Sequence, residues 1–451
     1  MHPSHLKKVR AGVCPPLESR RGSSGRGLLK LVQQLDKFVK SAPGRWAELS
    51  SCSGRGVVNQ TTGALAAFEL FPIARNLVGE QPSLSTPTGT APMNPASGQD
   101  SLPVIRAVER MLPPHYARQD QIIGALRELW ATRHYNLERL EELHRSVQVD
   151  GRFLALPIER YPGLVTFQQR NDAWIQVATD LGEQVVRKAL DRAGLTPQDV
   201  DHVFFVTVTG IATPSIEARL MNRLGMRPDM KRTPIFGLGC VAGAAGTARA
   251  SDYLRAWKGH TALLISVELC SLTLQREDLS IPNIIASGLF GDGAACVVLR
   301  GGECPDAGPR VVATRSVMYP NTERIMGWDV VDTGFKVVLS AKVPQLAREF
   351  IRRDVDGFLA EHGLTRKDVK HWVAHTGGPK VLQSFEEALE LPPEALARSW
   401  ASLREVGNLS SASVLFVLGE MLESGEAQPG DWGVMMAMGP GFCAELVLLR
   451  W

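Results

Sequence analysis

The chain has 451 residues, of which 44% are hydrophobic and 22% charged, a balance typical of a folded protein with a substantial buried core. Its 50 basic and 47 acidic side chains give a formal net charge of +3, which is too even to predict a nucleic-acid partner. We expect a cytoplasmic protein without membrane insertion, disulfide framework or zinc ribbon, because no apolar run reaches the length of a bilayer span and the seven cysteines form no C-x-x-C pair.

Residues 1–100 differ in composition from everything that follows. The first 30 positions are basic and rich in Ser and Gly, and Pro, Ser, Thr and Gly dominate 81–98, as in a flexible linker. We predict a disordered N-terminal extension over 1–100 with one short helix over 28–39, and Met93 as a candidate start of the folded part. A targeting or docking role for this extension is the alternative.

The remainder of the chain contains a repeated pattern. Apolar residues at helical spacing predict a helix over 168–193 that ends at Gly194, followed by a buried strand over 203–208. The residues Gly-Leu-Thr-Pro-Gln-Asp-Val-Asp-His-Val at 194–203 return as Gly-Leu-Thr-Arg-Lys-Asp-Val-Lys-His-Trp at 363–372, again ahead of an apolar strand. We infer an α/β protein with two similar halves, 101–314 and 315–451, each offering the carboxyl end of a strand to one shared site.

Cys240 lies between a strand predicted over 234–239 and a helix of small residues that begins at Val241. A thiol at the start of a helix feels the positive end of the helix dipole, which lowers its pKa and makes the nucleophilic thiolate available. We therefore predict that Cys240 is a nucleophile. The alternative is a small buried residue without chemistry, as free cysteines often are.

Two polar residues of the second half complete the candidate site. His375 ends the apolar strand that begins at Trp372, and Asn408 lies ahead of an apolar helix over 414–418. A thiolate can accept an acyl group, while an imidazole and an amide donate hydrogen bonds to a thioester carbonyl and stabilise the enolate left when a malonyl unit loses carbon dioxide. A helix N-cap is the alternative role for Asn408.

Five segments in this order, 239–243, 289–295, 372–379, 407–411 and 438–442, resemble the chalcone/stilbene synthase family of type III polyketide synthases, in a bacterial-type member. The resemblance runs from about 104 to 451. It implies that Cys240 is the nucleophile, His375 the decarboxylation histidine and Asn408 its asparagine partner. It also implies a homodimer with the thiolase fold, in which duplicated α/β halves form a layered αβαβα arrangement, and acyl-CoA and malonyl-CoA as substrates without a metal or redox cofactor.

The same resemblance places the substrate pocket. Gly439, Pro440 and Gly441 correspond to the family's scaffold loop around the site, and Thr213 is a further pocket residue. Leu274 stands near the position where plant members carry a gatekeeper phenylalanine, and a smaller gate suits an alkyl starter better than an aromatic one.

The second gatekeeper corresponds to Phe335 in the stretch 334–339. Ordinary core packing is the alternative for both gate positions.

The family's basic residues for the phosphates of coenzyme A come from the segment that corresponds to 139–152. Here Glu142 and Ser146 occupy two of the expected basic positions, which leaves Arg139 and Arg145 as rim contacts. An acyl chain presented on an acyl carrier protein is therefore an alternative to a coenzyme A ester. Solvated arginines without a role are the simpler interpretation.

We predict a type III polyketide synthase that extends a Cys-linked acyl starter by decarboxylative Claisen condensation with malonyl-CoA and cyclises the product to an alkylpyrone or alkylresorcinol. The closest alternative is a single-condensation ketosynthase that joins two carrier-bound polyketide chains into an α-pyrone. A dinucleotide-binding oxidoreductase is another, because glycines 237, 239 and 243 follow a strand and Glu268 ends the next one, although the spacing departs by one residue. A non-catalytic scaffold that only binds an acyl chain is the third.

Overall fold

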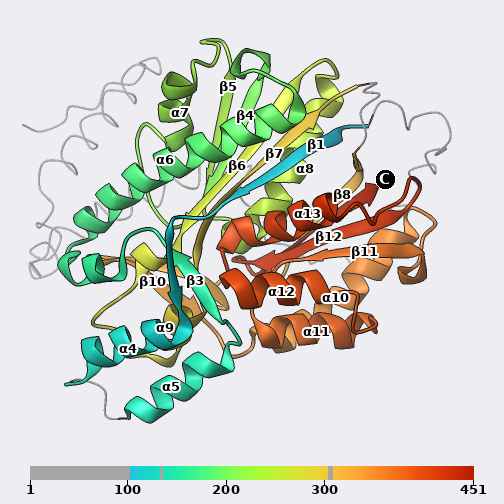
Figure 1. The fold of residues 1–451 in the computed structure, drawn as a ribbon. Helices are drawn as coiled ribbons and strands as arrows, with labels where there is room; N and C mark the ends of the chain where they lie inside the picture. The colour runs from blue at the N-terminus through green and yellow to red at the C-terminus, as the bar shows by residue number, and fades with distance from the viewer. Residues whose placement is uncertain (1–101, 133–135, 303–307) are drawn as a thin grey trace, which may run out of the picture. The chain divides into compact units, whose positions relative to one another are not determined.

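The structure is a computed structural model that describes residues 102–132, 136–302 and 308–451. The extension expected over 1–100, with its short helix, lies outside the described residues. Nine strands form one mixed sheet in the order β11-β12-β13-β8-β1-β7-β6-β4-β5 (Figure 1). The strands are β1 (Val104–Met111), β4 (His202–Thr207), β5 (Lys231–Phe236), β6 (Thr261–Leu269), β7 (Asp292–Arg300), β8 (Arg310–Met318), β11 (Val369–Ala374), β12 (Trp432–Gly439) and β13 (Cys443–Arg450).

The sheet consists of two blocks, one from each half of the chain. Strands β1 and β8, the inner strands of the two blocks, are paired at Val104 and Arg310. The predicted boundary between 314 and 315 falls inside β8, and β8 pairs along its whole length with β13 of the second block.

The repeated sequence pattern forms the same local structure twice. Helix α6 (Phe167–Ala193) ends at Gly194 with a φ of 64°, and helix α10 (Val343–Ala360) is followed by Gly363 with a φ of 69°. In the next turn of each half, the backbone N–H and hydroxyl of a threonine donate to an aspartate three residues later, at 2.7 Å for Thr196 and 2.8 Å for Thr365. These turns lead into β4 and β11, which pair with parallel neighbours. The predicted duplication is confirmed.

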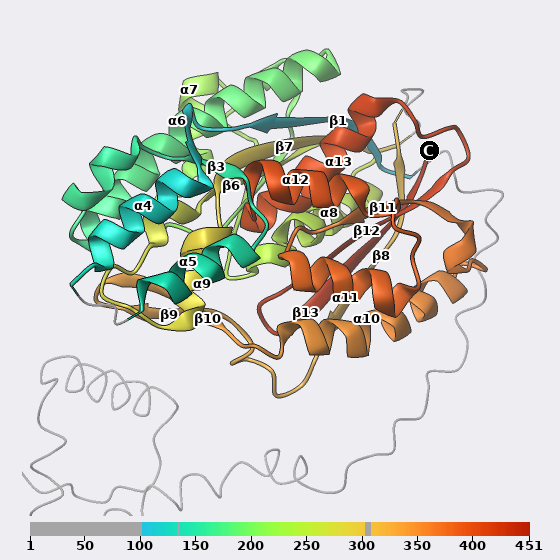
Figure 2. The ribbon, with the colours of Figure 1, turned by 60° about the horizontal axis from the view of Figure 1, so that its bottom comes forward.

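Helices cover both outer faces and fill the space between the two blocks (Figures 1 and 2). The inner layer is α8 (Ala242–Ala256) and α13 (Ser413–Ser424), whose residues share one core cluster with strands of both blocks. Helices α6 and α7 (Ile216–Leu224) pack on the first block, and α10, α11 (Pro379–Leu389) and α12 (Ala397–Val406) on the second. This is the predicted αβαβα layering of the thiolase fold.

Small residues in α8 allow the inner layer to pack this closely. A Cβ added at Gly243 would lie 2.3 Å from the carbonyl oxygen of Ser411, and one at Gly246 would lie 2.5 Å from a methyl of Leu264. Helix α13 is buried on almost all sides, which explains its continuous apolar sequence.

The remaining elements gather at one end of the sheet (Figures 1 and 2). Their small apolar core includes Ile122, Trp130 and Leu140. The elements are β2 (His115–Arg118), α4 (Gln119–Trp130), α5 (Leu137–Ser146), β3 (Gly151–Leu154), α9 (Ile281–Leu289), β9 (Met326–Val331) and β10 (Gly334–Leu339). Among them, α4, β3, α9, β9 and β10 contribute residues to the walls of two cavities.

Candidate active site

Cys240 lies in a single 3-10 turn, Gly239–Val241, between the end of β5 and the start of α8. Gly239 has a φ of 54°, and a Cβ at this position would lie 2.8 Å from the Pro440 ring, so the turn requires glycine. The Cys240 side chain is buried, with 7% of the residue exposed, and its Sγ lies 3.9 Å from the Ser410 hydroxyl oxygen.

Burial dominates the electrostatics of this thiol. It raises the pKa of Cys240 to about 12, although the hydrogen bond with Ser410 acts in the opposite direction. Burial therefore acts against the lowering of the Cys240 pKa that the sequence predicted from the helix dipole.

His375 directly follows β11, and its backbone N–H extends the ladder by donating to the Met436 carbonyl at 3.0 Å. The residue is 2% exposed, and burial lowers the pKa of the imidazole to about 3. The ring is therefore neutral at physiological pH. Its Nδ1 is buried without a hydrogen-bond partner among the described residues, so placing the ring proton on Nε2 leaves a lone pair, rather than an N–H, unsatisfied.

Asn408 is held by backbone hydrogen bonds to the turn between α9 and β7. Its N–H donates to the Leu289 carbonyl and its carbonyl accepts from the Gly291 N–H, both at 2.9 Å. The side-chain Oδ1 accepts the Ser410 N–H at 2.8 Å, which leaves the Nδ2 group as the donor for a ligand. Helix α13 begins at Ser413, so Asn408 caps a local turn and not this helix.

The structure brings Cys240, His375 and Asn408 to the wall of one cavity with a volume of about 720 Å³. Cys240 follows β5 of the first block and His375 follows β11 of the second, and both strands have a parallel neighbour. This is the arrangement expected for a site at the carboxyl ends of strands. Pro440 lines the same cavity from the loop after β12.

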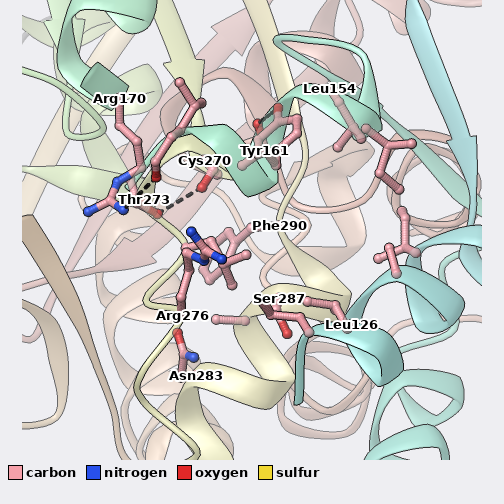
Figure 3. Close-up of a pocket in the computed structure, with 18 of the residues that line it drawn as sticks. Leu126, Leu154, Tyr161, Arg170, Cys270, Thr273, Arg276, Asn283, Ser287 and Phe290 are labelled. Carbon is pink, nitrogen blue, oxygen red and sulfur yellow. Dashed lines mark hydrogen bonds between the residues drawn. The ribbon is translucent and has the colours of Figure 1, made fainter. Parts of the chain in front are cut away.

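A second, larger cavity of about 1050 Å³ lies beside the first, between α4, β3, α9 and the turns Ile158–Gly163 and Cys270–Thr273. Figure 3 shows Leu154, Tyr161 and Cys270 along one side of it and Ser287 and Asn283 along the other. Most of the lining is apolar, but hydroxyl, amide and guanidinium groups interrupt it. The two cavities share four lining residues: Cys270, Phe290, Trp328 and Val337.

The two predicted gate residues lie in different places. Leu274 lines the larger cavity but not the one that contains Cys240, His375 and Asn408, which we call the catalytic cavity. Phe335 lines neither of the two and packs instead against Phe167, with ring centroids 5.4 Å apart. The wall position belongs to Val337, two residues further along β10.

Sequence reasoning missed Phe290 and Trp328. Phe290 lies inside the segment 289–295, which served only as evidence of a family resemblance, and an aromatic side chain directly before a buried glycine turn was the available signal. Trp328 lies in the short strand β9, whose six residues, MGWDVV, form no pattern that marks it as a cavity residue. Both lie where the two cavities meet.

The other pocket residues take different places. Thr213 lies on an exposed loop, joined by a cis peptide bond to Pro214, and lines neither cavity. Gly439 ends β12 against the Cys240 turn, where a Cβ would lie 3.0 Å from the Val241 nitrogen. Gly441 has a φ of 142° and precedes a cis peptide bond to Phe442, which lines the catalytic cavity.

Arg139 and Arg145 lie on α5 with exposed side chains. Arg139 pairs with Glu142 at 2.8 Å and Arg145 with Glu141 at 2.6 Å, and neither arginine lines the cavities. Exposed ion pairs of this kind are weak, so they leave both guanidinium groups able to turn toward an anionic ligand.

Arg152 has a different environment from these surface arginines. It is 3% exposed and donates to the Gln119 side-chain oxygen at 2.8 Å and to the Gly288 carbonyl at 2.5 Å.

Glu268, the residue on which an oxidoreductase would depend, is fully buried. Its carboxyl group accepts from the Ser411 hydroxyl at 2.5 Å, the Thr209 hydroxyl at 2.9 Å and the Val208 N–H at 3.0 Å. Within the described ranges there is no cluster of three or more potential metal ligands, and no helix is long and apolar enough to cross a membrane.

Comparison with known proteins decides the family. The chain matches the N-terminal domain of chalcone and stilbene synthases over residues 99–303 and their C-terminal domain over residues 310–451. The chain belongs to the chalcone and stilbene synthase family. It is therefore a bacterial-type type III polyketide synthase, an acyltransferase, and the oxidoreductase alternative is wrong.

Similar proteins match about three quarters of this synthase. A 1,3,6,8-tetrahydroxynaphthalene synthase from Streptomyces peucetius subsp. caesius is 51% identical over 350 residues, which are 77% of this chain and 93% of that protein. A putative chalcone synthase from Bacillus subtilis (strain 168) is 36% identical over 77% of this chain and 98% of its own length. The crystal structure of 1,3,6,8-tetrahydroxynaphthalene synthase from Streptomyces coelicolor A3(2) superposes with a TM-score of 0.74 at 32% identity, covering 77% of this chain and 99% of that one.

Proposed function

We propose that this synthase builds an aromatic polyketide from malonyl units, with a product of the tetrahydroxynaphthalene class. One observation carries the proposal: polar side chains such as Tyr161, Ser271 and Asn283 interrupt the apolar wall of the larger cavity. A poly-β-ketone chain carries an oxygen on every second carbon and needs such partners, whereas a plain alkyl chain does not. The 51% identity to a protein with this activity supports the same class.

In the proposed mechanism the Cys240 sulfur attacks the carbonyl carbon of the acyl-CoA thioester, and the thiol proton passes to the neutral imidazole of His375. The bond to the coenzyme A sulfur then breaks, and His375 gives the proton to that sulfur and becomes neutral again. Both groups are neutral and buried at rest, with the pKa of Cys240 raised and that of His375 lowered. The ion pair that forms during acyl transfer is stabilised by its own attraction, which is strong once the acyl donor has excluded water.

Decarboxylation of the malonyl unit then depends on His375 and Asn408. The Nε2–H of a neutral His375 and the Nδ2 group of Asn408 donate to the malonyl thioester carbonyl, where negative charge develops as carbon dioxide leaves. The hydrogen bond from the Ser410 N–H fixes the orientation of the Asn408 amide in advance. The resulting enolate attacks the acyl group on Cys240 and extends the chain.

Phe290 and Trp328 control the passage of the growing chain, because both line the catalytic cavity and the larger one. Two aromatic side chains at this place leave room for a small starter beside Cys240. The extended chain then enters the larger cavity, where it folds and cyclises.

An alkylpyrone or alkylresorcinol made from a long-chain acyl starter is the second candidate. The aliphatic side chains of α4, including Ile122, Leu126 and Leu129, favour it because they would accommodate an alkyl tail. Leu274 lies on the same wall. Incubating the full-length protein with malonyl-CoA alone, and with malonyl-CoA plus a long-chain acyl-CoA, separates the two by mass spectrometry. Aromatic product from malonyl-CoA alone supports the first candidate, and product only with the acyl-CoA refutes it.

We propose coenzyme A esters as substrates, with Arg139 and Arg145 as contacts at the rim, and a cytoplasmic homodimer as the working form, without a metal or redox cofactor. An acyl carrier protein is the alternative carrier. Comparing turnover of malonyl-CoA with that of a malonyl-loaded carrier protein tests the carrier. Light scattering of the eluting protein tests the dimer.

A further inference from the structure

The larger cavity contains a chain of hydrogen-bonded groups that the condensation mechanism does not use. The Tyr161 hydroxyl lies 2.5 Å from the Ser271 hydroxyl, and Ser271 in turn donates to the carboxyl group of Asp292. Tyr161 and Ser271 line the cavity, while Asp292 has no exposed surface. Figure 3 shows Tyr161 at the cavity wall. The chain thus connects a cavity wall to a buried carboxyl group.

The number of available protons fixes the direction of this chain. Ser271 has one hydroxyl hydrogen, which it gives to Asp292, so the hydrogen between Tyr161 and Ser271 must come from Tyr161. The Tyr161 oxygen can therefore accept hydrogen bonds from other groups. It accepts the Leu156 N–H at the long distance of 3.4 Å, and the Ala155 N–H acts on it in the same direction, so a group in the cavity competes with two backbone donors.

Asp292 is positioned firmly enough to receive a proton. Its Oδ1 accepts the Ser271 N–H at 2.8 Å and its Oδ2 accepts the Ala155 N–H at 2.6 Å. Both contacts fix the carboxyl group relative to the walls formed by β3 and by the turn Cys270–Thr273. A relay needs this fixed geometry, because each proton has to move along an existing hydrogen bond.

We propose that Tyr161, Ser271 and Asp292 form a proton relay that closes the ring of the polyketide. The inference rests on the proposed function only in requiring that a poly-β-ketone chain cyclises in the larger cavity. A methylene between two carbonyl groups gives its proton to the Tyr161 oxygen, while the Tyr161 proton moves to Ser271 and the Ser271 proton moves to Asp292.

The atoms and charges of this step balance without a further reactant. The electron pair of the broken C–H bond forms the new C–C bond to a carbonyl carbon further along the chain. The π electrons of that carbonyl move to its oxygen. The proton held by Asp292 then returns along the relay to this oxygen, and the three side chains regain their starting states.

The surroundings of Asp292 suit a base of this kind. Burial raises the pKa of Asp292 to about 6, while the hydrogen bonds from Ser271 and Ala155 and the nearby Arg152 limit the rise. The other titratable groups that sense its charge are Tyr161 and Cys270, on the two adjoining turns. Asp292 is therefore ionised above about pH 6 and yet a stronger base than an exposed carboxylate. The pKa of Tyr161 is raised by burial and by Asp292, so the phenol stays protonated at rest.

Two conservative substitutions test the relay, Tyr161→Phe and Ser271→Ala, with Tyr253→Phe as the matched control. The Tyr253 hydroxyl contacts His260 Nδ1 at 2.5 Å and Tyr253 lines neither cavity, so its loss is the same chemical change at an unrelated place. Each full-length protein receives malonyl-CoA with and without a long-chain acyl-CoA. Release of carbon dioxide is counted, and ring products are separated from open-chain acids and lactones by mass spectrometry.

We expect the ratio of ring to open-chain product to fall by about 10²-fold in both relay variants, as for loss of a general acid–base group, and by much more than the release of carbon dioxide falls. In the unchanged protein this ratio falls as the pH drops through about 6, and in Ser271→Ala that dependence disappears. An unchanged ratio in either variant overturns the relay. So does an equal loss of carbon dioxide release and ring product, because that result shows a structural role.

Failure of the proposed function gives a different result. If the unchanged protein makes ring product only from the long-chain starter, then the proposed product class is wrong. The ratio of ring to open-chain product in the three variants still decides for or against the relay in that case.

Discussion

Replacing Asn408 with alanine has two consequences of different size, and the structure separates them. The Nδ2 donor to the malonyl carbonyl is lost, and removal of one such donor lowers kcat by about 10²–10³-fold, or about 3–4 kcal/mol of barrier. The acceptor of the Ser410 N–H is lost as well, and leaving that buried N–H unpaired lowers the free energy of unfolding by about 1–3 kcal/mol.

Asn408→Asp keeps an acceptor for the Ser410 N–H and, while the carboxylate is ionised, provides no donor to the substrate. We expect a catalytic loss at least as large as that of the alanine variant. The free energy of unfolding also falls, because the position is 2% exposed and burying a carboxylate is costly. Asn171→Ala serves as the control, since its side chain only bonds the backbone of Ile211 on an exposed loop.

The assay is the release of carbon dioxide from malonyl-CoA at saturating substrate, together with a urea unfolding curve for each variant. Release is chosen over product formation because it reports the decarboxylation step without chain extension or cyclisation. If Asn408→Asp decarboxylates as fast as the unchanged protein, then the amide is not a donor to the developing enolate, and the assignment of Asn408 is refuted.

Three further predictions concern the inner layer and the buried titratable groups. Cys240→Ala should abolish product and the covalent acyl adduct seen by mass spectrometry while retaining malonyl decarboxylation, which needs only the hydrogen-bond donors. Gly243→Ala should lower the free energy of unfolding, measured from urea curves, by about 1–3 kcal/mol, because the new Cβ would clash with the Ser411 carbonyl oxygen. Gly124→Ala is the control: its Cβ would lie in open space on α4 and should raise that free energy by about 0.5–1 kcal/mol. Burial lowers the pKa of His375 in the folded protein to about 3, below its ordinary 6.5. As the pH falls from 6.5 toward 3, only the unfolded chain binds this proton, so the free energy of unfolding should decrease over that window. The decrease should be less steep in His375→Asn.

The three polar residues of the catalytic cavity could be named from the sequence because each follows a pattern that fixes its place. A strand end can be recognised from a run of apolar residues that stops at a glycine turn, and parallel strands bring their carboxyl ends to one edge. The repeat at 194–203 and 363–372 shows that two such edges exist in one chain. These local sequence patterns are therefore sufficient to place Cys240 and His375 on neighbouring turns.

The walls of the cavities depend on distances that the sequence does not contain. Phe335 and Val337 lie on the same side of β10, but two residues along a strand span about 7 Å, which separates an aromatic core position from the cavity wall. The raised pKa of Cys240 depends on burial beneath the Pro440 loop, some two hundred residues away in the chain. In the same way, Tyr161 and Ser271 meet only in the folded protein.

The two cavities divide the chemistry by electrostatic environment. In the catalytic cavity burial favours the neutral forms of Cys240 and His375, so in the proposed mechanism charge forms there only when a thioester has entered and water has left. Such a site favours the steps that create an enolate beside its donors and does not stabilise free carboxylates. The larger cavity keeps a buried ionised carboxyl group, Asp292, behind its wall and therefore favours removal of a proton from a chain that is already complete. In the proposed mechanism extension and ring closure are thereby separated in space. Phe290 and Trp328, which line both cavities, lie where the chain would pass from one to the other.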